Sequence, residues 1–126
     1  MSWDREKVST ALVELLGPAT GVKVHQYPLR IVNPPSVTVS DPSVSKNTGG
    51  YGIDVATVPL VVVCGYEDTA GAIAITGAIF SALGPSTNLG GAVFECQPTE
   101  ERNWRNFTGA GGVQLLLVDV MVEVKM

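Results

Sequence analysis

Near the start of the chain, apolar residues recur at intervals of three and four positions, and this spacing places them on one stripe of a helix. Ser2 can cap the first turn with its hydroxyl, and Gly17-Pro18 supplies the glycine and the proline that commonly end a helix. The pattern therefore predicts a helix from Ser2 to Leu16. Its apolar stripe consists of Val8, Ala11, Leu12, Leu15 and Leu16.

The apolar period then falls to two, which is typical of strands. The first predicted strand runs from Val22 to His25, and the second runs from Ser36 to Ser40 with prolines before and after it. A third, from Ile53 to Gly65, contains the β-branched run Val61-Val62-Val63. Such a run indicates a central strand that is buried on both faces.

A second helix is predicted to begin at Glu67-Asp68-Thr69, because carboxylates suit the positive end of a helix dipole and Asp or Thr can cap the first turn. Gly84-Pro85 ends it. One face of this helix is expected to be rich in small residues. That face is expected to contain Ile73, Ala74, Gly77, Phe80 and either Ser81 or Leu83.

Two more strands are predicted, from Ala92 to Gln97 and from Val113 to Lys125. In the last one, alternate residues are apolar while Asp119, Glu123 and Lys125 mark the other face as solvated. The order helix, two or three strands, helix, two strands predicts an α+β fold, with one mixed or antiparallel sheet and two helices on one face. Residues 1–126 are expected to form a single domain. The apolar face of the last strand consists of Leu116, Val118, Val120, Val122 and Val124.

Two segments are expected to be irregular. The stretch from Asp41 to Gly52 has almost no apolar side chain and is predicted to be a mobile loop. The stretch from Pro98 to Gly112 is also predicted to be a loop, although two aromatic residues and two arginines are more than a simple turn needs. Arg and Trp often anchor protein interfaces. An interface, and a small satellite core under the sheet, are equally favoured explanations of this segment.

Length, charge and hydropathy restrict the classes of function that the chain can have. A length of 126 residues with a net charge of −4 argues for one compact domain and against a nucleic-acid binder built on basic charge. Charged residues make up 16% of the chain, whereas roughly 25% is usual in soluble domains, which favours a surface partly buried in an assembly. The first residues lack a signal-peptide pattern and no apolar run is long enough for a membrane span, so we expect a protein that begins in a cytoplasm.

Residues that usually carry chemistry are few. Cys64 and Cys96 lie in apolar runs and are expected to be buried thiols, with a disulfide or a reactive cysteine as the less favoured alternative. His25 is the single histidine, which excludes a histidine-rich metal site. Neither Thr48–Gly52 nor Gly109–Gly112 is followed by the lysine of a phosphate-binding loop. We therefore expect no enzymatic activity, no cofactor and no metal.

The order of elements resembles that of the tail terminator proteins of long-tailed bacteriophages, the family of the lambda-type minor tail protein. The resemblance rests on the capped first helix, the proline-rich early strands and the strand-to-helix unit from Ile53 to Leu83. It also rests on the segment Arg102-Asn103-Trp104-Arg105-Asn106-Phe107, which leads into a long hydrophobic final strand. It covers nearly the whole chain in architecture and length.

This resemblance implies a structural protein of the virion, located at the tail and neck and assembled in the host cytoplasm. It implies a homo-hexameric ring that sits on the tail tube protein, stops tube polymerisation and docks to a neck or head-completion protein. DNA would only pass through the lumen, so neither sequence-specific nucleic-acid binding nor membrane binding is expected.

Composition also suggests which side chains make these contacts. Those expected to contact another subunit or the tube are Arg102, Trp104, Arg105 and Phe107. Those expected to dock or to line the lumen are Lys46, Asn47 and Tyr51. One alternative is a head–tail neck or stopper protein. Another, from a different class, is a non-viral dimeric α+β domain that binds a ligand in a cleft near Cys64 or Trp104.

Overall fold

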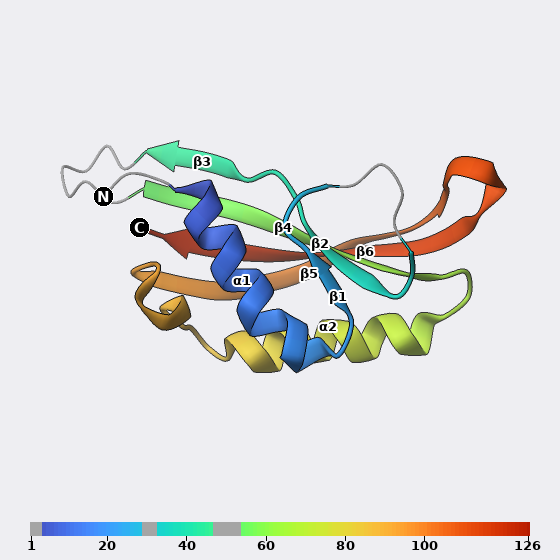
Figure 1. Cartoon of the computed structure of the whole chain (residues 1–126), viewed down its shortest axis with the longest axis horizontal. Helices are drawn as coiled ribbons and strands as arrows, with labels where there is room; N and C mark the ends of the chain where they lie inside the picture. Colours follow the sequence, from blue (N-terminus) through green and yellow to red (C-terminus); the bar gives the residue numbers. More distant parts are fainter. Residues whose placement is uncertain (1–3, 29–32, 47–53) are drawn as a thin grey trace.

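The computed structural model describes residues 4–28, 33–46 and 54–126, which form two α-helices and a six-stranded sheet (Figure 1). The predicted α+β class is confirmed. The helices are α1 Arg5–Thr20 and α2 Thr69–Leu83. The strands are β1 Lys23–His25, β2 Ser36–Val39, β3 Ser43–Lys46, β4 Asp54–Gly65, β5 Glu95–Thr108 and β6 Gln114–Lys125. Short 3-10 turns at Leu89–Gly91 and Ala110–Gly112 come before and after β5.

The sheet is mixed and open. Its strand order is β1-β2-β4-β6-β5, and β3 pairs with β4 on the same edge as β2. Strands β1 and β2 are parallel, whereas the other pairs within the described residues are antiparallel. Both helices pack on one face of this sheet, as predicted (Figure 1).

The hydrophobic core lies between the sheet and the two helices. Alternate side chains leave a strand on opposite faces, and in β6 the apolar set turns toward the helices, as predicted. Asp119, Glu123 and Lys125 lie on the other face, where Lys125 pairs with Glu123 at 3.8 Å. This face is less solvated than predicted, because Leu115 and Leu117 are buried there with Val63 in a second, smaller cluster, and Met121 is buried too. Fully buried core residues include Leu12, Leu16, Leu60, Val62, Ile79, Val118, Val120, Val122 and Val124.

Helix α1 begins and ends later than predicted. Asp4, not Ser2, is the N-cap, and its Oδ1 accepts from the backbone N of Lys7 at 3.1 Å. The helix continues through Pro18 to Gly21, whose φ of 70° provides the left-handed cap. A residue before proline is normally kept out of the helical region by a clash that involves its Cβ. Gly17 has no Cβ, and so this proline does not stop the helix.

Helix α2 has the predicted bounds, and Ile73, Ala74, Gly77 and Ser81 of the predicted small-residue face lie together on its exposed side, whereas Leu83, the alternative to Ser81, is buried. Asp68 caps it by accepting from the backbone N of Gly71 at 3.1 Å, and Gly84 ends it with φ of 60°. Ile73 on this side is 58% exposed. The helix is apolar all round, so its periodicity does not distinguish the inner side. The buried residues are Ala72, Ile75, Thr76, Ile79 and Leu83.

Both predicted loops contain strand. Ser43–Lys46, inside the stretch expected to be a loop, forms β3 and pairs with β4, while residues 47–52 of that stretch lie outside the described residues. The segment from Pro98 to Thr108 belongs to β5. Its irregular parts are two bulges within the strand and the turn that follows. Backbone pairing with β6 makes it a strand in spite of its polar side chains.

The orientation of α2 on the sheet can be tested with a matched pair of substitutions. We expect Ile79→Ala to lower the free energy of unfolding by about 2–5 kcal/mol, because Ile79 is fully buried and its loss leaves a cavity. Ile73→Ala, on the outer face of the same helix, is expected to change it by less than about 0.5 kcal/mol. Urea denaturation followed by circular dichroism measures both. Equal losses would contradict the orientation of α2.

Candidate protein interface

A long antiparallel hairpin of β5 and β6 forms one side of the molecule, and β5 is an edge of the sheet. Its turn end extends past both helices (Figure 1, orange and red). The turn is closed by the backbone N of Gly109, which donates to the carbonyl of Val113 at 2.7 Å. Gly111 in this turn has a φ of 75°, a conformation that residues with a Cβ rarely adopt.

Two bulges interrupt β5, one between Pro98 and Glu100 and one between Arg102 and Arg105. At the second bulge Asn103 has a φ of 63°, in the left-handed region that Asn tolerates better than most residues. Bulges twist an edge strand, and proline offers it no backbone donor, so both features discourage another strand from pairing there. This edge is therefore suited to contacts through side chains.

Asp119 of β6 holds the second bulge. Its carboxylate accepts from Nη1 of Arg105 at 3.1 Å and from Nδ2 of Asn103 at 3.2 Å. The same Nη1 of Arg105 donates to the backbone carbonyl of Asn103 at 2.8 Å. The Asp119 side chain is only 14% exposed, which limits the solvent screening of this ion pair. The guanidinium of Arg105 thus already forms its hydrogen bonds and ion pair within the chain.

The four predicted contact residues all lie on this hairpin. Trp104 is 38% exposed and Phe107 is 52% exposed, so the alternative that they form a satellite core under the sheet is wrong. Arg102 is exposed too, and its Nη1 lies 3.5 Å from Oε1 of Glu100, a loose surface pair. The hairpin therefore presents two aromatic side chains and one weakly held cation to solvent.

The structure describes only one of the three residues predicted to dock or to line the lumen. Lys46 ends β3, while Asn47 and Tyr51 lie outside the described residues. Their role in docking or in lining a lumen stays a prediction.

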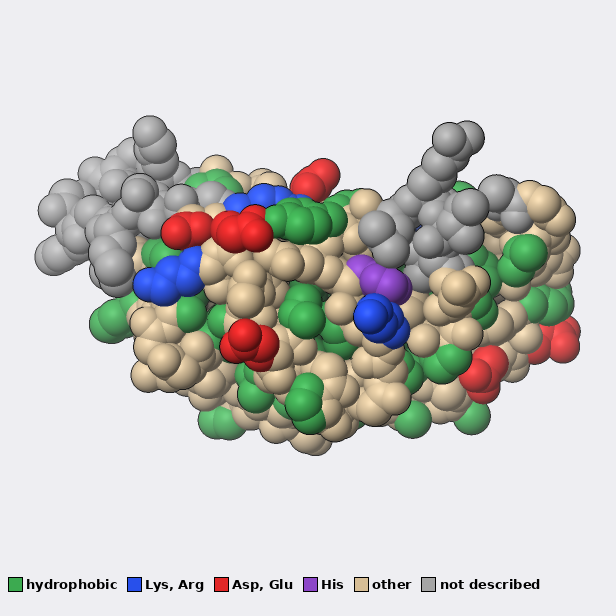
Figure 2. All heavy atoms as spheres, viewed as in Figure 1, with side chains coloured by type: hydrophobic (Ala, Val, Ile, Leu, Met, Phe, Trp, Pro, Cys, Tyr) green, Lys and Arg blue, Asp and Glu red, His purple; other side chains and the backbone are tan. Residues whose placement is uncertain are grey.

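A further exposed surface is the outer face of α2, which was predicted as a face of small residues but not as a surface exposed to solvent. Its exposed residues are Ala70, Ile73, Ala74, Gly77 and Ser81. Hydrophobic side chains also appear along the lower edge of the molecule, where α2 lies (Figure 2). The signal was present in the sequence, since no charged residue occurs from Thr69 to Leu83. A helix with solvent on its outer side usually carries charge there.

The thiols and the histidine are not arranged for catalysis. Burial raises the pKa of Cys96 to about 12, and burial, followed by the nearby Asp68 carboxylate, raises the pKa of Cys64. Both thiols are therefore protonated at neutral pH and poorly nucleophilic. His25 in β1 and Cys96 in β5 lie at opposite edges of the sheet, separated by about 19 Å of paired strands.

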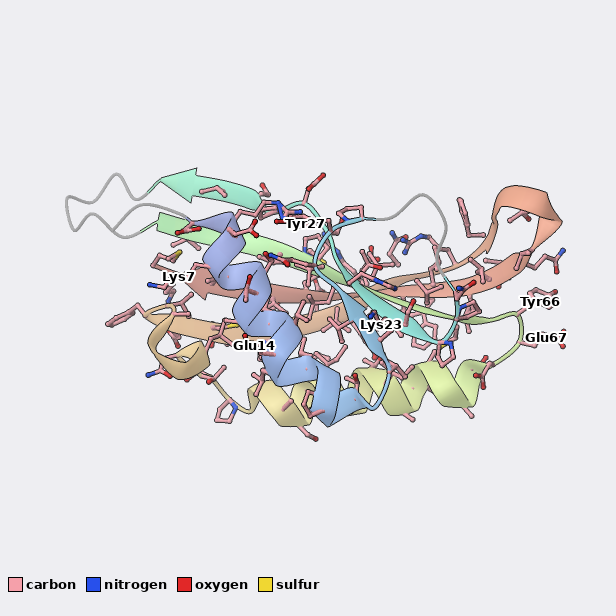
Figure 3. All side chains as sticks on the ribbon, viewed as in Figure 1. Lys7, Glu14, Lys23, Tyr27, Tyr66 and Glu67 are labelled. Carbon is pink, nitrogen blue, oxygen red and sulfur yellow. The ribbon has the colours of Figure 1, made fainter. Side chains whose placement is uncertain are left out.

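Other kinds of site find little support. Within residues 4–28, 33–46 and 54–126, no group of three His, Cys, Asp or Glu side chains could hold a metal ion. An open groove of about 480 Å³ lies between α1 and the turn after α2, and it is lined by solvated side chains such as Glu6, Lys7 and Glu14. Lys7 and Glu14 point outward from α1 (Figure 3). A small-molecule site would enclose most of its ligand.

None of the helices in the described ranges has the length and hydropathy needed to cross a membrane.

Comparison with known proteins gives a match in fold. No protein-family model and no curated protein matches the sequence. Among solved structures, a chain of the virion of the native gene transfer agent particle is similar to this chain with a TM-score of 0.60 and 13% sequence identity. The match covers 96% of this chain and 92% of that chain. The similarity therefore extends over nearly the whole of both chains, and at this identity it shows a shared fold.

The buried thiol offers a test of the inert-cysteine interpretation. We expect Cys96 in the folded protein to resist alkylation at pH 8 and to react rapidly once urea unfolds the chain. Peptide mapping by mass spectrometry distinguishes it from Cys64. Because the folded thiol keeps its proton to about pH 12 while the unfolded thiol loses it above 9.0, stability should fall as the pH rises through that window. Rapid labelling of the folded protein at pH 8 would contradict this.

Proposed function

We propose that this protein is a structural component of a virion and that its copies form a ring that caps the tail tube. In this role the ring stops tube polymerisation and docks the tail to the neck of the head. The observation that carries the proposal is the similarity to a virion chain over 96% of this chain and 92% of that one. A match of that extent involves the whole fold rather than a local motif.

The surface supports assembly over catalysis. Large apolar side chains that gather on a surface mark interaction sites. The exposed large apolar side chains include Ile73 on α2 and Trp104 and Phe107 on the hairpin, and only 16% of residues are charged. The groove beside α1 is too open to enclose a ligand, and no group of three His, Cys, Asp or Glu in the described residues could hold a metal ion, which weighs against a ligand-binding domain.

The charge is compatible with a conduit for DNA. A net charge of −4 repeats at every position of a ring and repels a polyanion. The partners we propose are further copies of this chain, six in a ring, together with the tail tube protein and a neck or head-completion protein. The proposed location is the virion, after assembly in the host cytoplasm.

The assembly state and tube binding test the proposal together. Native mass spectrometry of the purified protein, alone and mixed with tail tubes built from the tube protein of the same gene cluster, is expected to give a hexamer or a ring formed only on tubes. Electron microscopy should locate it at tube ends. Binding to an isolated neck complex but not to tubes would favour the neck or stopper alternative. A stable dimer indifferent to both would exclude either role.

The hairpin aromatic provides a mutational test. We expect Trp104→Ala to weaken ring or tube association by about tenfold or more, as for a truncated aromatic anchor, while the monomer stays folded. Phe94→Ala is the control, because Phe94 is an exposed aromatic residue outside β5 and should have little effect. Mass photometry measures association and circular dichroism measures folding. Loss of folding in Trp104→Ala would instead assign this side chain a structural role.

A further inference from the structure

The outer face of α2 is exposed and uncharged. All 15 residues of the helix are uncharged, and its buried side already packs on the sheet. Ile73 projects from the opposite side, flanked by Ala74 and by Gly77, which has no side chain. The result is a shallow surface with small residues, which suits a bulky side chain better than it suits water.

The hairpin supplies side chains of the complementary shape. Trp104 and Phe107 are large, aromatic and exposed, and they are fixed on a strand whose bulge is held by Asp119. Within one copy, both these aromatics and Ile73 remain exposed, so neither surface covers the other. A contact between the two requires a second copy of the chain.

The charged residues beside the two surfaces are also of opposite sign. Glu67 and Tyr66 occupy the turn before α2 and point outward at that end of the molecule (Figure 3). Asp68 is committed to capping α2, whereas Glu67 forms no ion pair within the described residues. On the hairpin, Arg102 is held only by a 3.5 Å pair with Glu100. One surface thus has an available anion at its border, and the other has Arg102, a cation that lies next to the exposed acids Glu100 and Glu101 on the same strand.

We propose that the hairpin of one copy docks on α2 of the next copy, with Trp104 and Phe107 against Ile73 and with Arg102 facing Glu67. This contact joins two different surfaces, so it repeats from copy to copy and generates a ring if the rotation closes. The proposal rests on the ring proposed above and identifies the surfaces that build it. The partner at this contact is a second copy of the same chain.

Charge reversal tests this contact directly. Arg102→Glu and Glu67→Arg, each alone, are expected to lower the association constant of the oligomer by about tenfold or more, because each places like charges opposite one another. An equimolar mixture of the two variants should assemble again. In an alternating ring each altered hairpin meets an altered helix, and each native hairpin meets a native helix. The double variant should also assemble. Sedimentation velocity over a concentration series measures all four samples.

Two controls separate this contact from general effects of charge or folding. Glu14→Arg changes an exposed acid on α1 by the same charge and should leave assembly unchanged. Ile73→Asp should abolish assembly while circular dichroism shows a folded chain, since Ile73 is 58% exposed. If Ile73→Asp abolishes assembly but neither Arg102→Glu nor Trp104→Ala affects it, two α2 faces pack on each other and the proposal is overturned.

The outcomes also separate this proposal from the proposed function. Rings that cap tubes but ignore both charge reversals, or single variants whose mixture does not reassemble, would overturn the contact and leave the function standing. Rescue in the mixture without any binding to tubes would support the contact and overturn the tube-capping role. A wild-type chain that stays monomeric with and without tubes would overturn both.

Discussion

The antiparallel pairing of β4 with β6 is the interaction on which the rest of the structure depends. These strands of 12 residues each lie in the middle of the sheet, and every strand except β1 is attached directly to one of them. Their register turns Leu60, Val62, Val118 and Val120 toward the helices, where all four are fully buried. A slip of one residue would expose these side chains and bury Asp119. Burial therefore fixes both the register and the face that the helices cover.

The same register determines which side chains the β5–β6 hairpin exposes to solvent. Because Asp119 lies on the face away from the helices, its carboxylate is free to hold Arg105 and Asn103 at the second bulge of β5. The bulge adds twist to the edge and keeps the strand from pairing with another. Trp104 lies within this bulged segment and stays exposed. The bulged part of β5 thereby holds side chains in place for contacts with another molecule.

Elements with one apolar and one polar face could be predicted from the sequence. The cap at Asp68 and the alternation that turns the apolar set of β6 toward the helices are local signals, and these predictions are confirmed. The other face of β6 is less solvated than predicted, because Leu115, Leu117 and Met121 on it are buried. Strand β5 has no such signal, since its distal half mixes polar residues with Trp104 and Phe107 without regular alternation and is bulged, and it is a strand because residues of β6 pair with it. The end of α1 depends on Gly21 rather than on Pro18, and the orientation of α2 depends on tertiary packing because the helix is apolar all round. The four hairpin residues of the candidate interface could be selected by type, but their grouping required the hairpin register.

The uncharged face of α2 and the aromatic residues of the hairpin are exposed in a free copy and have to be covered in the proposed ring. A free copy must stay dispersed, and the net charge of −4 together with the bulged edge opposes association through strands. In the proposed ring, an assembled copy covers both apolar surfaces. Two α2 faces packed on each other would cover the helix and leave Trp104 and Phe107 in water. A contact between hairpin and helix covers one surface of each kind, and only a closed ring repeats it until no copy has either surface left exposed.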